Sequence, residues 1–113
     1  MVLRGAPTWG GTPTWGDNNV AMGHILKFSG ASIEKYDAVN EELGWAGEEG
    51  KPQGLLAHAA GQIDNGFCVV EWWNSEADWD TFFSSRLQPA FDKVGGIPQP
   101  QVTRFPVHRS YPV

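Results

Sequence analysis

Residues able to move a proton at neutral pH lie in the middle of the chain, among aromatic side chains. His58 follows the run Gly54-Leu-Leu-Ala, and Glu71 lies within Val69-Val-Glu-Trp-Trp73. Imidazole titrates nearest to neutral pH, so His58 is the first candidate for a general base or hydrogen-bond partner. Glu71 would orient the imidazole, or act as the base itself if burial raises its pKa.

The two segments that carry these residues, 55–62 and 67–73, are predicted to be strands of a hairpin. Asn65-Gly66 suits a two-residue turn, because both central residues of such a turn need positive φ. In that register Gln62 opposes Val69, Ala60 opposes Glu71 and His58 opposes Trp73. A three-residue loop would set His58 against Trp72 instead. One face then carries His58, Ala60, Glu71 and Trp73, and the other carries Cys68, Val70 and Trp72.

Two helices are predicted to flank this hairpin in sequence. The first is capped by Ser32 and runs through Leu43, with Tyr36 and Asn40 on its inward apolar face. The second begins on Ser75, in a near capping box with Asp78. Its apolar side extends to residue 94, and Pro89 predicts a kink or restart at Gln88. The apolar stripe and neighbouring positions of this second helix comprise Trp79, Phe82, Phe83, Arg86, Leu87, Phe91 and Val94.

The full order of elements is strand, helix, strand, strand, helix, strand. Strands at 24–29 and 101–108 complete the set, and the loop 45–53 is expected to be exposed. Pro106 cannot donate to a ladder, which places the last strand at a sheet edge. This order predicts an α+β fold: a ferredoxin-like βαββαβ sandwich with a four-stranded antiparallel sheet and two helices on one face. The hairpin strands are apolar on both faces, so a second copy is expected to cover the open face in a homodimer.

Composition excludes several classes of partner. The chain has 113 residues and a formal net charge of −5, which suits one domain and disfavours binding to nucleic acid or anionic membranes. No apolar run is long enough to cross a membrane. A lone cysteine, Cys68, forms no internal disulfide and favours the reducing cytoplasm. Residues 1–22 repeat Pro-Thr-Trp-Gly and are predicted to be a disordered extension, with the domain at 23–113. The alternative is an arm that docks Trp9 and Trp15 onto a partner subunit.

The chain from His24 to Tyr111 resembles the antibiotic-biosynthesis-monooxygenase-like proteins of the dimeric α+β barrel superfamily. The resemblance rests on His58 after Gly54-Leu-Leu-Ala, Trp73-Asn-Ser75, Phe82-Phe83 with Arg86-Leu-Gln-Pro-Ala90, and Val102-Thr-Arg-Phe-Pro-Val-His108. It implies a dimeric α+β barrel. Its characterised members include oxygenases that oxidise phenolic polyketides without a metal or flavin, haem-degrading enzymes and polyketide cyclases. Haem degradation in this group uses a histidine on the second helix, and residues 75–94 contain none.

The cofactor-free oxygenases imply a mechanism in which an electron-rich phenol loses a proton and its carbanion reduces dioxygen. His58 and Glu71 are then the catalytic candidates, with no cofactor and no metal. Binding of a small hydrophobic or aromatic substrate falls to Tyr36, Asn40, Trp73, Phe82 and Arg86. Trp73 and Phe82 would form an aromatic slot, while Tyr36 and Asn40 would orient a phenol.

Other interpretations of the same residues stay open. His58 and Tyr36 are also consistent with structural residues whose hydrogen bonds are satisfied. Glu71 is also consistent with an ion pair to Arg104 or Arg86 at an interface. The tryptophans are also consistent with core or dimer packing. His24 and His108 lie near strand ends and are expected to be exposed. The alternatives to an oxygenase are a non-catalytic binding protein for an apolar molecule and a stress-associated structural dimer.

Overall fold

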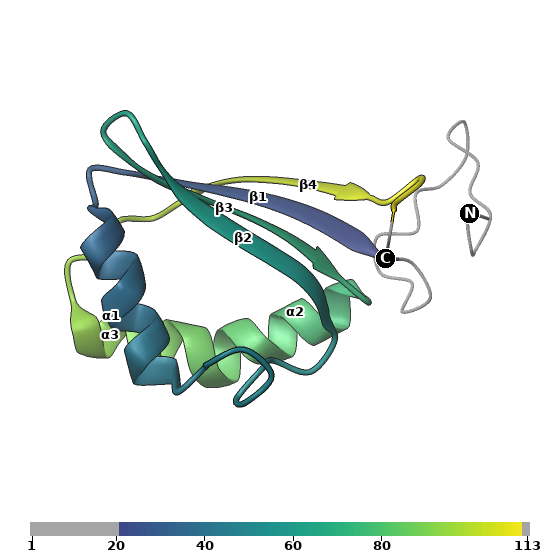
Figure 1. Cartoon of the computed structure of the whole chain (residues 1–113), viewed down its shortest axis with the longest axis horizontal. Helices are drawn as coiled ribbons and strands as arrows, with labels where there is room; N and C mark the ends of the chain where they lie inside the picture. Colours follow the sequence, from purple (N-terminus) through teal and green to yellow (C-terminus); the bar gives the residue numbers. More distant parts are fainter. Residues whose placement is uncertain (1–20, 112–113) are drawn as a thin grey trace.

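The computed structural model describes residues 21–111 and contains one four-stranded sheet with its helices on one face (Figure 1). Its elements are β1 (Met22–Ser29), α1 (Ile33–Leu43), β2 (Leu55–Ile63), β3 (Gly66–Trp73), α2 (Glu76–Phe82), the π-helical turn η1 (Phe83–Leu87), α3 (Gln88–Val94) and β4 (Gln101–Pro106). The predicted extension lies outside the described residues, except that β1 already begins at Met22, which is fully buried.

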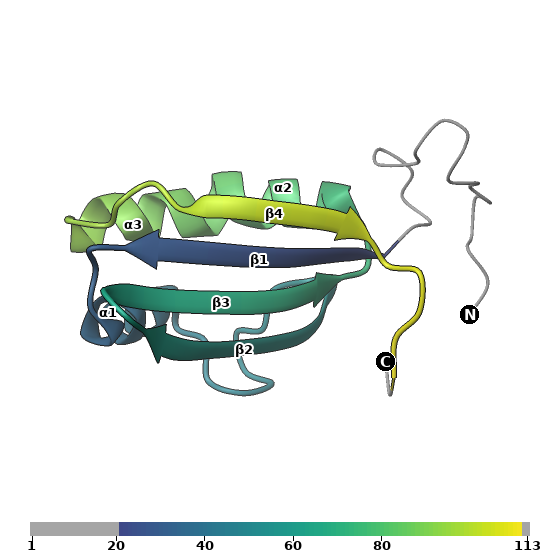
Figure 2. The same cartoon turned by 90° about the horizontal axis from the view of Figure 1, so that it is seen from above.

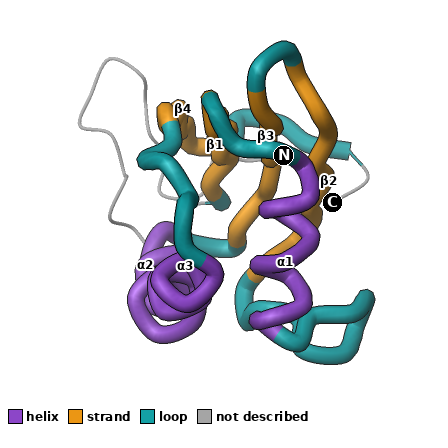
Figure 3. The backbone as a smooth tube through the Cα atoms, turned by 90° about the vertical axis from the view of Figure 1, so that its left-hand side faces the viewer, coloured by secondary structure: helices purple, strands orange, loops and turns teal. Residues whose placement is uncertain are grey.

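The strands are antiparallel and lie in the order β2-β3-β1-β4 (Figure 2). This confirms the predicted ferredoxin-like sandwich. β4 is an edge strand, as Pro106 required, because a residue without an N–H cannot complete ladders on both sides. α1 lies below β2 and β3, whereas α2 and α3 lie toward β1 and β4 (Figure 3). The core fills the space between sheet and helices, and its two clusters centre on Phe28 with Phe67 and on Trp73 with Phe82.

The β2–β3 hairpin differs from the predicted register by two residues. The loop is Asp64-Asn65, Ile63 pairs with Gly66, and His58 therefore opposes Glu71, where we expected Trp73. Asn65 adopts the positive φ of 61°. Gly66 belongs to β3 and opposes Ser29 of β1, where a Cβ would overlap the carbonyl oxygen of Phe28. A shift of two residues preserves the faces, so the predicted grouping of side chains holds although the partners change.

A bulge near the start of β2 reverses the alternation of its side chains there. The pairing passes from Leu55↔Trp73 to Ala57↔Trp72, which leaves Leu56 as the extra residue. Leu55 consequently packs with Trp73 in the core, whereas simple alternation placed it on the opposite face. A bulge inserts one unpaired residue and reverses the alternation on one side of it. His58 and Leu55 therefore face the helices together.

The helical segment after β3 begins as predicted and changes geometry before Pro89. The Ser75 hydroxyl accepts a hydrogen bond from the Asp78 amide, which caps α2. Gln88 keeps helical dihedral angles, and its amide donates to the Phe83 carbonyl to close the wide turn η1. The Pro89 ring would crowd the carbonyl of the preceding turn in a regular helix, and a π-helical turn relieves such crowding. The expected kink is thus a widened turn upstream of Gln88.

Candidate functional site

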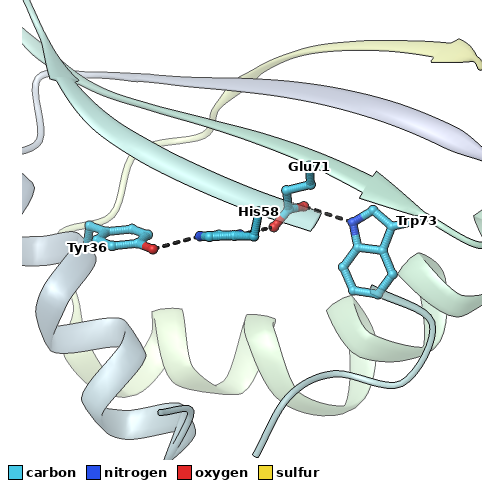
Figure 4. A network of polar contacts seen from close by, with 4 residues as sticks. All are labelled: Tyr36, His58, Glu71 and Trp73. Atoms are coloured by element: carbon cyan, nitrogen blue, oxygen red, sulfur yellow. Dashed lines mark hydrogen bonds and ion pairs between the residues drawn. The ribbon is translucent and has the colours of Figure 1, made fainter. Parts of the chain in front are cut away.

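Four of the predicted site residues form one continuous chain of hydrogen bonds under the sheet (Figure 4). The Tyr36 hydroxyl lies 2.7 Å from His58 Nε2, and His58 Nδ1 lies 2.8 Å from Glu71 Oε2. Trp73 Nε1 donates to the other carboxylate oxygen of Glu71 at 2.9 Å. Phenol, imidazole, carboxylate and indole thus follow one another, with Glu71 only 4% exposed.

Three elements position these groups. Tyr36 lies on the inward face of α1, and His58 lies directly opposite Glu71 in the β2–β3 ladder. Trp73 is two residues beyond Glu71 on the same strand, so both side chains point to the helix side of the sheet. The strand pairing therefore sets the His58–Glu71 contact, and the packing of α1 on the sheet brings Tyr36 to the far side of the imidazole.

The donors and acceptors fix one arrangement of protons for neutral His58. Indole N–H is a donor only, and a carboxylate is an acceptor, so Glu71 accepts from Trp73 and from His58 Nδ1–H. His58 Nε2 is then free to accept the Tyr36 hydroxyl. Burial raises the pKa of the Tyr36 phenol above its usual value, and the neighbouring Asn40 side chain partly opposes this rise. Tyr36 is therefore a protonated donor at neutral pH.

His24 is a buried neighbour of this site, although the sequence predicted it to be exposed. It opposes Glu71 on one side and Arg104 on the other, which extends the row His58–Glu71–His24–Arg104 across all four strands. Instead of being exposed, it is 0% accessible, and among the described residues neither ring nitrogen finds a hydrogen-bond partner. Burial lowers the pKa of His24 to about 4, although the Glu71 charge works in the opposite direction. Its ring packs edge-on against Trp79 at 4.9 Å.

The signal for His24 was present in the sequence. Met22, His24, Leu26 and Phe28 alternate with Gly23, Ile25 and Lys27, and the first set faces the core. Met22 is fully buried, so the strand begins earlier than predicted and His24 lies well inside it. By contrast, His108 is exposed, as expected.

A small cavity of about 40 Å³ lies between α1, the helical segment η1–α3 and the sheet. Tyr36, Asn40, His58, Glu71 and Phe82 all contribute to its lining, so the structure brings these five candidates together. The volume accommodates a few water molecules and is far below the roughly 300 Å³ at which small-molecule pockets begin. In this conformation the cavity is too small for an aromatic substrate.

Trp73 and Arg86 do not line this cavity. The Trp73 indole is fully buried and packs against Phe82, with ring centroids 5.4 Å apart. The Arg86 guanidinium donates to the carbonyl oxygens of Leu43 and Gly50 at 3.2 and 2.9 Å. Arg86 therefore braces the loop after α1. The alternative ion pair of Glu71 with Arg104 or Arg86 does not form within the chain, because Arg104 pairs with Glu76.

Trp45 is a further residue of the site that the sequence did not indicate. We expected residues 45–53 to be exposed, but Trp45 is half-buried and its ring lies edge-on to His58 at 4.7 Å. Its indole N–H donates to the Gly47 carbonyl, and Pro52 in the same loop is fully buried. Trp45 thus lies against the imidazole and forms part of the cavity wall.

The described residues contain neither a cluster of metal-ligand side chains nor a helix that could span a membrane. Within residues 21–111, no group of three or more His, Cys, Asp or Glu side chains is arranged to hold a metal ion. In the same range, no helix has both the length and the apolar character needed to cross a membrane.

Comparison with known proteins identifies the fold. No protein-family model and no curated protein sequence matches this chain. Solved structures do: SnoaB, a cofactor-independent oxygenase from Streptomyces nogalater, has a TM-score of 0.60 at 10% identity over 83% of this chain and 99% of its own. A candidate antibiotic biosynthesis monooxygenase from Chloroflexus aurantiacus gives 0.59 at 18% identity, over 80% and 96%. The chain therefore has the antibiotic-biosynthesis-monooxygenase-like fold that the sequence predicted.

The same fold also serves other chemistry. A hydroxynitrile lyase from Passiflora edulis matches with a TM-score of 0.53 at 16% identity, over 83% of this chain and 99% of that one. Identities this low establish the architecture alone, so the reaction has to be argued from the site.

Proposed function

We propose that this protein is a cofactor-independent monooxygenase for a hydroxylated aromatic, polyketide-like substrate. The observation that carries this proposal is the hydrogen-bonded series Tyr36–His58–Glu71 at the wall of a cavity whose remaining lining is apolar apart from Asn40. Oxidation of a phenol by dioxygen needs a proton acceptor, an apolar enclosure and shelter from water. The series supplies the first, and the surrounding aromatic and aliphatic side chains supply the others.

The proton moves along the series in two coupled steps. The substrate C–H bond next to the phenolic ring breaks, and its proton passes to Tyr36 Oη while the Tyr36 proton passes to His58 Nε2. Glu71, held by the Trp73 N–H, accepts the second imidazole N–H and stabilises the imidazolium that forms. The arrangement parallels the carboxylate–imidazole–hydroxyl order of hydrolytic triads, with a phenol in place of the serine.

Oxygen chemistry follows on the substrate itself. The carbanion reduces dioxygen as a C–O bond forms, and the peroxide anion takes back the proton held by His58 through Tyr36. The hydroperoxide then loses water as its O–O bond and the second C–H bond break. One oxygen atom ends as a ring carbonyl and the other as water. A methylene carbon flanked by phenolic rings thus becomes a quinone carbonyl, and its own two C–H bonds supply the electrons.

The experiment is oxygen uptake by the full chain with a hydroxylated anthrone. Tyr36→Phe and His58→Gln should each lower the rate by about 10²-fold or more, the usual contribution of a positioned proton acceptor. His108→Gln, at an exposed histidine, is the matched control and should leave the rate unchanged. Rates that are equal in all four proteins would refute the assignment of Tyr36 and His58.

One observation favours a second function, a non-catalytic binding protein. Every polar atom of Tyr36, His58 and the Glu71–Trp73 pair that the series uses already has a partner, as in a structural polar network. Saturable binding of the anthrone without oxygen uptake by the wild-type chain would support this alternative and overturn the oxygenase proposal.

We also propose a homodimer as the working form, in the reducing cytoplasm that the free Cys68 favours. The sheet face away from the helices carries Cys68, Val70 and Trp72, which are only half-buried. Phe105 on the same face is 41% exposed, and its ring lies over Gly23. A second copy packed against this face would remove its apolar surface from water.

A further inference from the structure

A second, larger cleft lies on the other side of the helical segment from the His58 cavity. It measures about 510 Å³ and is bounded by α2, η1, α3, the residues 95–100 and β4. Trp79, Phe83 and Phe91 contribute aromatic side chains to its lining. None of the seven residues predicted to be catalytic or substrate-binding lines it. Figure 3 shows α2 and α3 lying below β1 and β4, with the connection to β4 at one end. We call this space the helix–β4 cleft.

The helix–β4 cleft and the His58 cavity share a wall. Four side chains line both spaces: Leu26, Phe28, Leu87 and Phe91. The cleft falls within the roughly 300–1,000 Å³ range of small-molecule pockets, and the 40 Å³ cavity does not. The hydrogen-bonded series and a space of small-molecule size therefore lie on opposite sides of one layer of side chains.

The two halves of this wall differ in how firmly they are held. Leu26 and Phe28 belong to the central strand β1 and are 4% and 3% exposed. Leu87 and Phe91 are only half-buried, and Leu87 ends the π-helical turn η1. A π-helical turn holds one residue more than an α-helical turn, and such turns are frequent at functional sites. Displacement of Leu87 and Phe91 therefore disturbs less packing than displacement of the strand side.

The charges of the cleft select among aromatic ligands. Asp80 and Asp92 contribute carboxylates to the lining, and the lining cation Arg104 is already paired with Glu76. Carboxylates accept hydrogen bonds from hydroxyl groups and repel anions. The occupant that fits is an uncharged, planar polycyclic aromatic with hydroxyl donors, rather than a carboxylated or phosphorylated one.

We infer that the helix–β4 cleft binds the body of the substrate and that Leu87 and Phe91 form the movable wall between it and His58. The ring to be oxidised passes this wall to reach Tyr36 and His58, while the remaining rings stay against Trp79. This inference rests on the proposed function for its substrate class.

Two tryptophans report the two compartments separately. Trp79 lines only the helix–β4 cleft, and Trp45 lines only the His58 cavity. The probe is 1,8-dihydroxyanthracene, added to the full chain without oxygen while tryptophan emission is recorded. Trp79→Phe should remove most of the saturable quenching, and Trp45→Phe should remove the smaller part. Quenching that survives Trp79→Phe unchanged would overturn the assignment of the cleft.

The wall is tested by shortening it. Leu87→Ala should tighten binding about tenfold, because the ligand no longer displaces that side chain, and tenfold corresponds to 1.4 kcal/mol. Phe91→Leu keeps an apolar side chain and tests the same wall if Leu87→Ala fails to fold. Val94→Ala, on α3 but outside both linings, is the matched control and should not change affinity. Equal affinities in the wall variants and in wild type would overturn the gate.

The two proposals fail in different ways. Trp79-dependent binding that the wall variants tighten, without oxygen uptake, would refute the oxygenase and leave the cleft and its gate standing. Oxygen uptake that depends on Tyr36 and His58 but is unaffected by Trp79→Phe, Leu87→Ala and Phe91→Leu would refute the cleft and leave the oxygenase standing.

Discussion

At the scale of single residues, the site depends on a buried carboxylate that serves two donors. Glu71 accepts from His58 Nδ1 and from Trp73 Nε1 at 2.8 and 2.9 Å. A glutamine in its place would turn its N–H group toward one of these two donors. Two N–H groups would then face each other, and one hydrogen bond would be lost. A buried donor without a partner costs about 1–3 kcal/mol. In the proposed mechanism the same carboxylate holds His58 while it accepts the proton, so its loss is expected to affect both folding and the proposed proton transfer.

Glu71→Gln should therefore lower the free energy of unfolding by about 1–3 kcal/mol, measured by urea denaturation at pH 7. Glu42→Gln is the control, because Glu42 pairs with Lys93 at the surface, 3.2 Å away. Loss of a surface pair changes stability by less than about 1 kcal/mol. Equal effects of the two substitutions would contradict a structural role for the buried contacts of Glu71.

His24 gives the protein a specific dependence on pH. Its pKa is about 4 in the folded chain, against an ordinary value of 6.5, so the unfolded chain binds more protons between these values. The free energy of unfolding is therefore not reduced by His24 above pH 6.5, and it decreases as the pH falls toward 4. The loss is on the order of 3 kcal/mol, from 1.36 kcal/mol per pKa unit.

His24→Leu should remove this loss and also raise stability at pH 7, because both ring nitrogens of the wild-type residue are buried without a partner. The expected gain at pH 7 is about 1–3 kcal/mol, the cost of a buried unsatisfied polar group. Urea denaturation at pH 7 and pH 4.5 measures both effects, with His108→Gln as control. A variant whose stability still falls as steeply as that of wild type would show that His24 is not the source.

At the scale of elements, the β2–β3 hairpin decides which residue faces His58. Its register depends on Gly66 lying inside β3, against the Phe28 carbonyl of β1. Any side chain at Gly66 would force β1 and β3 apart at the turn. The hairpin also carries Gly61, whose Cβ position is open.

Gly66→Ala should destabilise the fold by several kcal/mol, whereas Gly61→Ala should change it by less than about 1 kcal/mol or stabilise it slightly. The comparison is matched, since both changes add one methyl group to the same hairpin. Thermal denaturation of the two variants measures the difference. If both melt alike, the close approach of Phe28 does not constrain the turn.

At the scale of the whole molecule, one face of the sheet is covered by helices and the other carries half-buried Val70 and Trp72. A charge placed at the centre of a sheet-to-sheet interface would be buried without a partner, which is costly. Val70→Lys should therefore convert the proposed dimer to a monomer, measured by light scattering after gel filtration. Ser84→Lys, an exposed change on the helical side, should leave the dimer intact. A wild-type chain that is monomeric would refute the dimer directly.

Most of the architecture could be predicted from the chain itself, because it depends on local patterns. Alternation and helical periodicity located each element, and Ser75 and Pro106 marked a helix cap and an edge strand. His58, Glu71, Tyr36 and Asn40 were selected by chemical type and by face. These signals lie within a few residues of the feature they determine, so they survive without knowledge of the rest of the fold.

The tertiary structure alone decided what depends on contacts between distant segments. Gly66 pairs with Ser29 of β1 inside β3, and the hairpin register sets Glu71 opposite His58. A bulge at Leu56 reversed the alternation at Leu55. The neighbouring strands buried His24. Folding of the loop after α1 brought Trp45 to the imidazole. Register, burial and cavity shape arise from steric fit between elements far apart in sequence, and local periodicity carries no information about that fit.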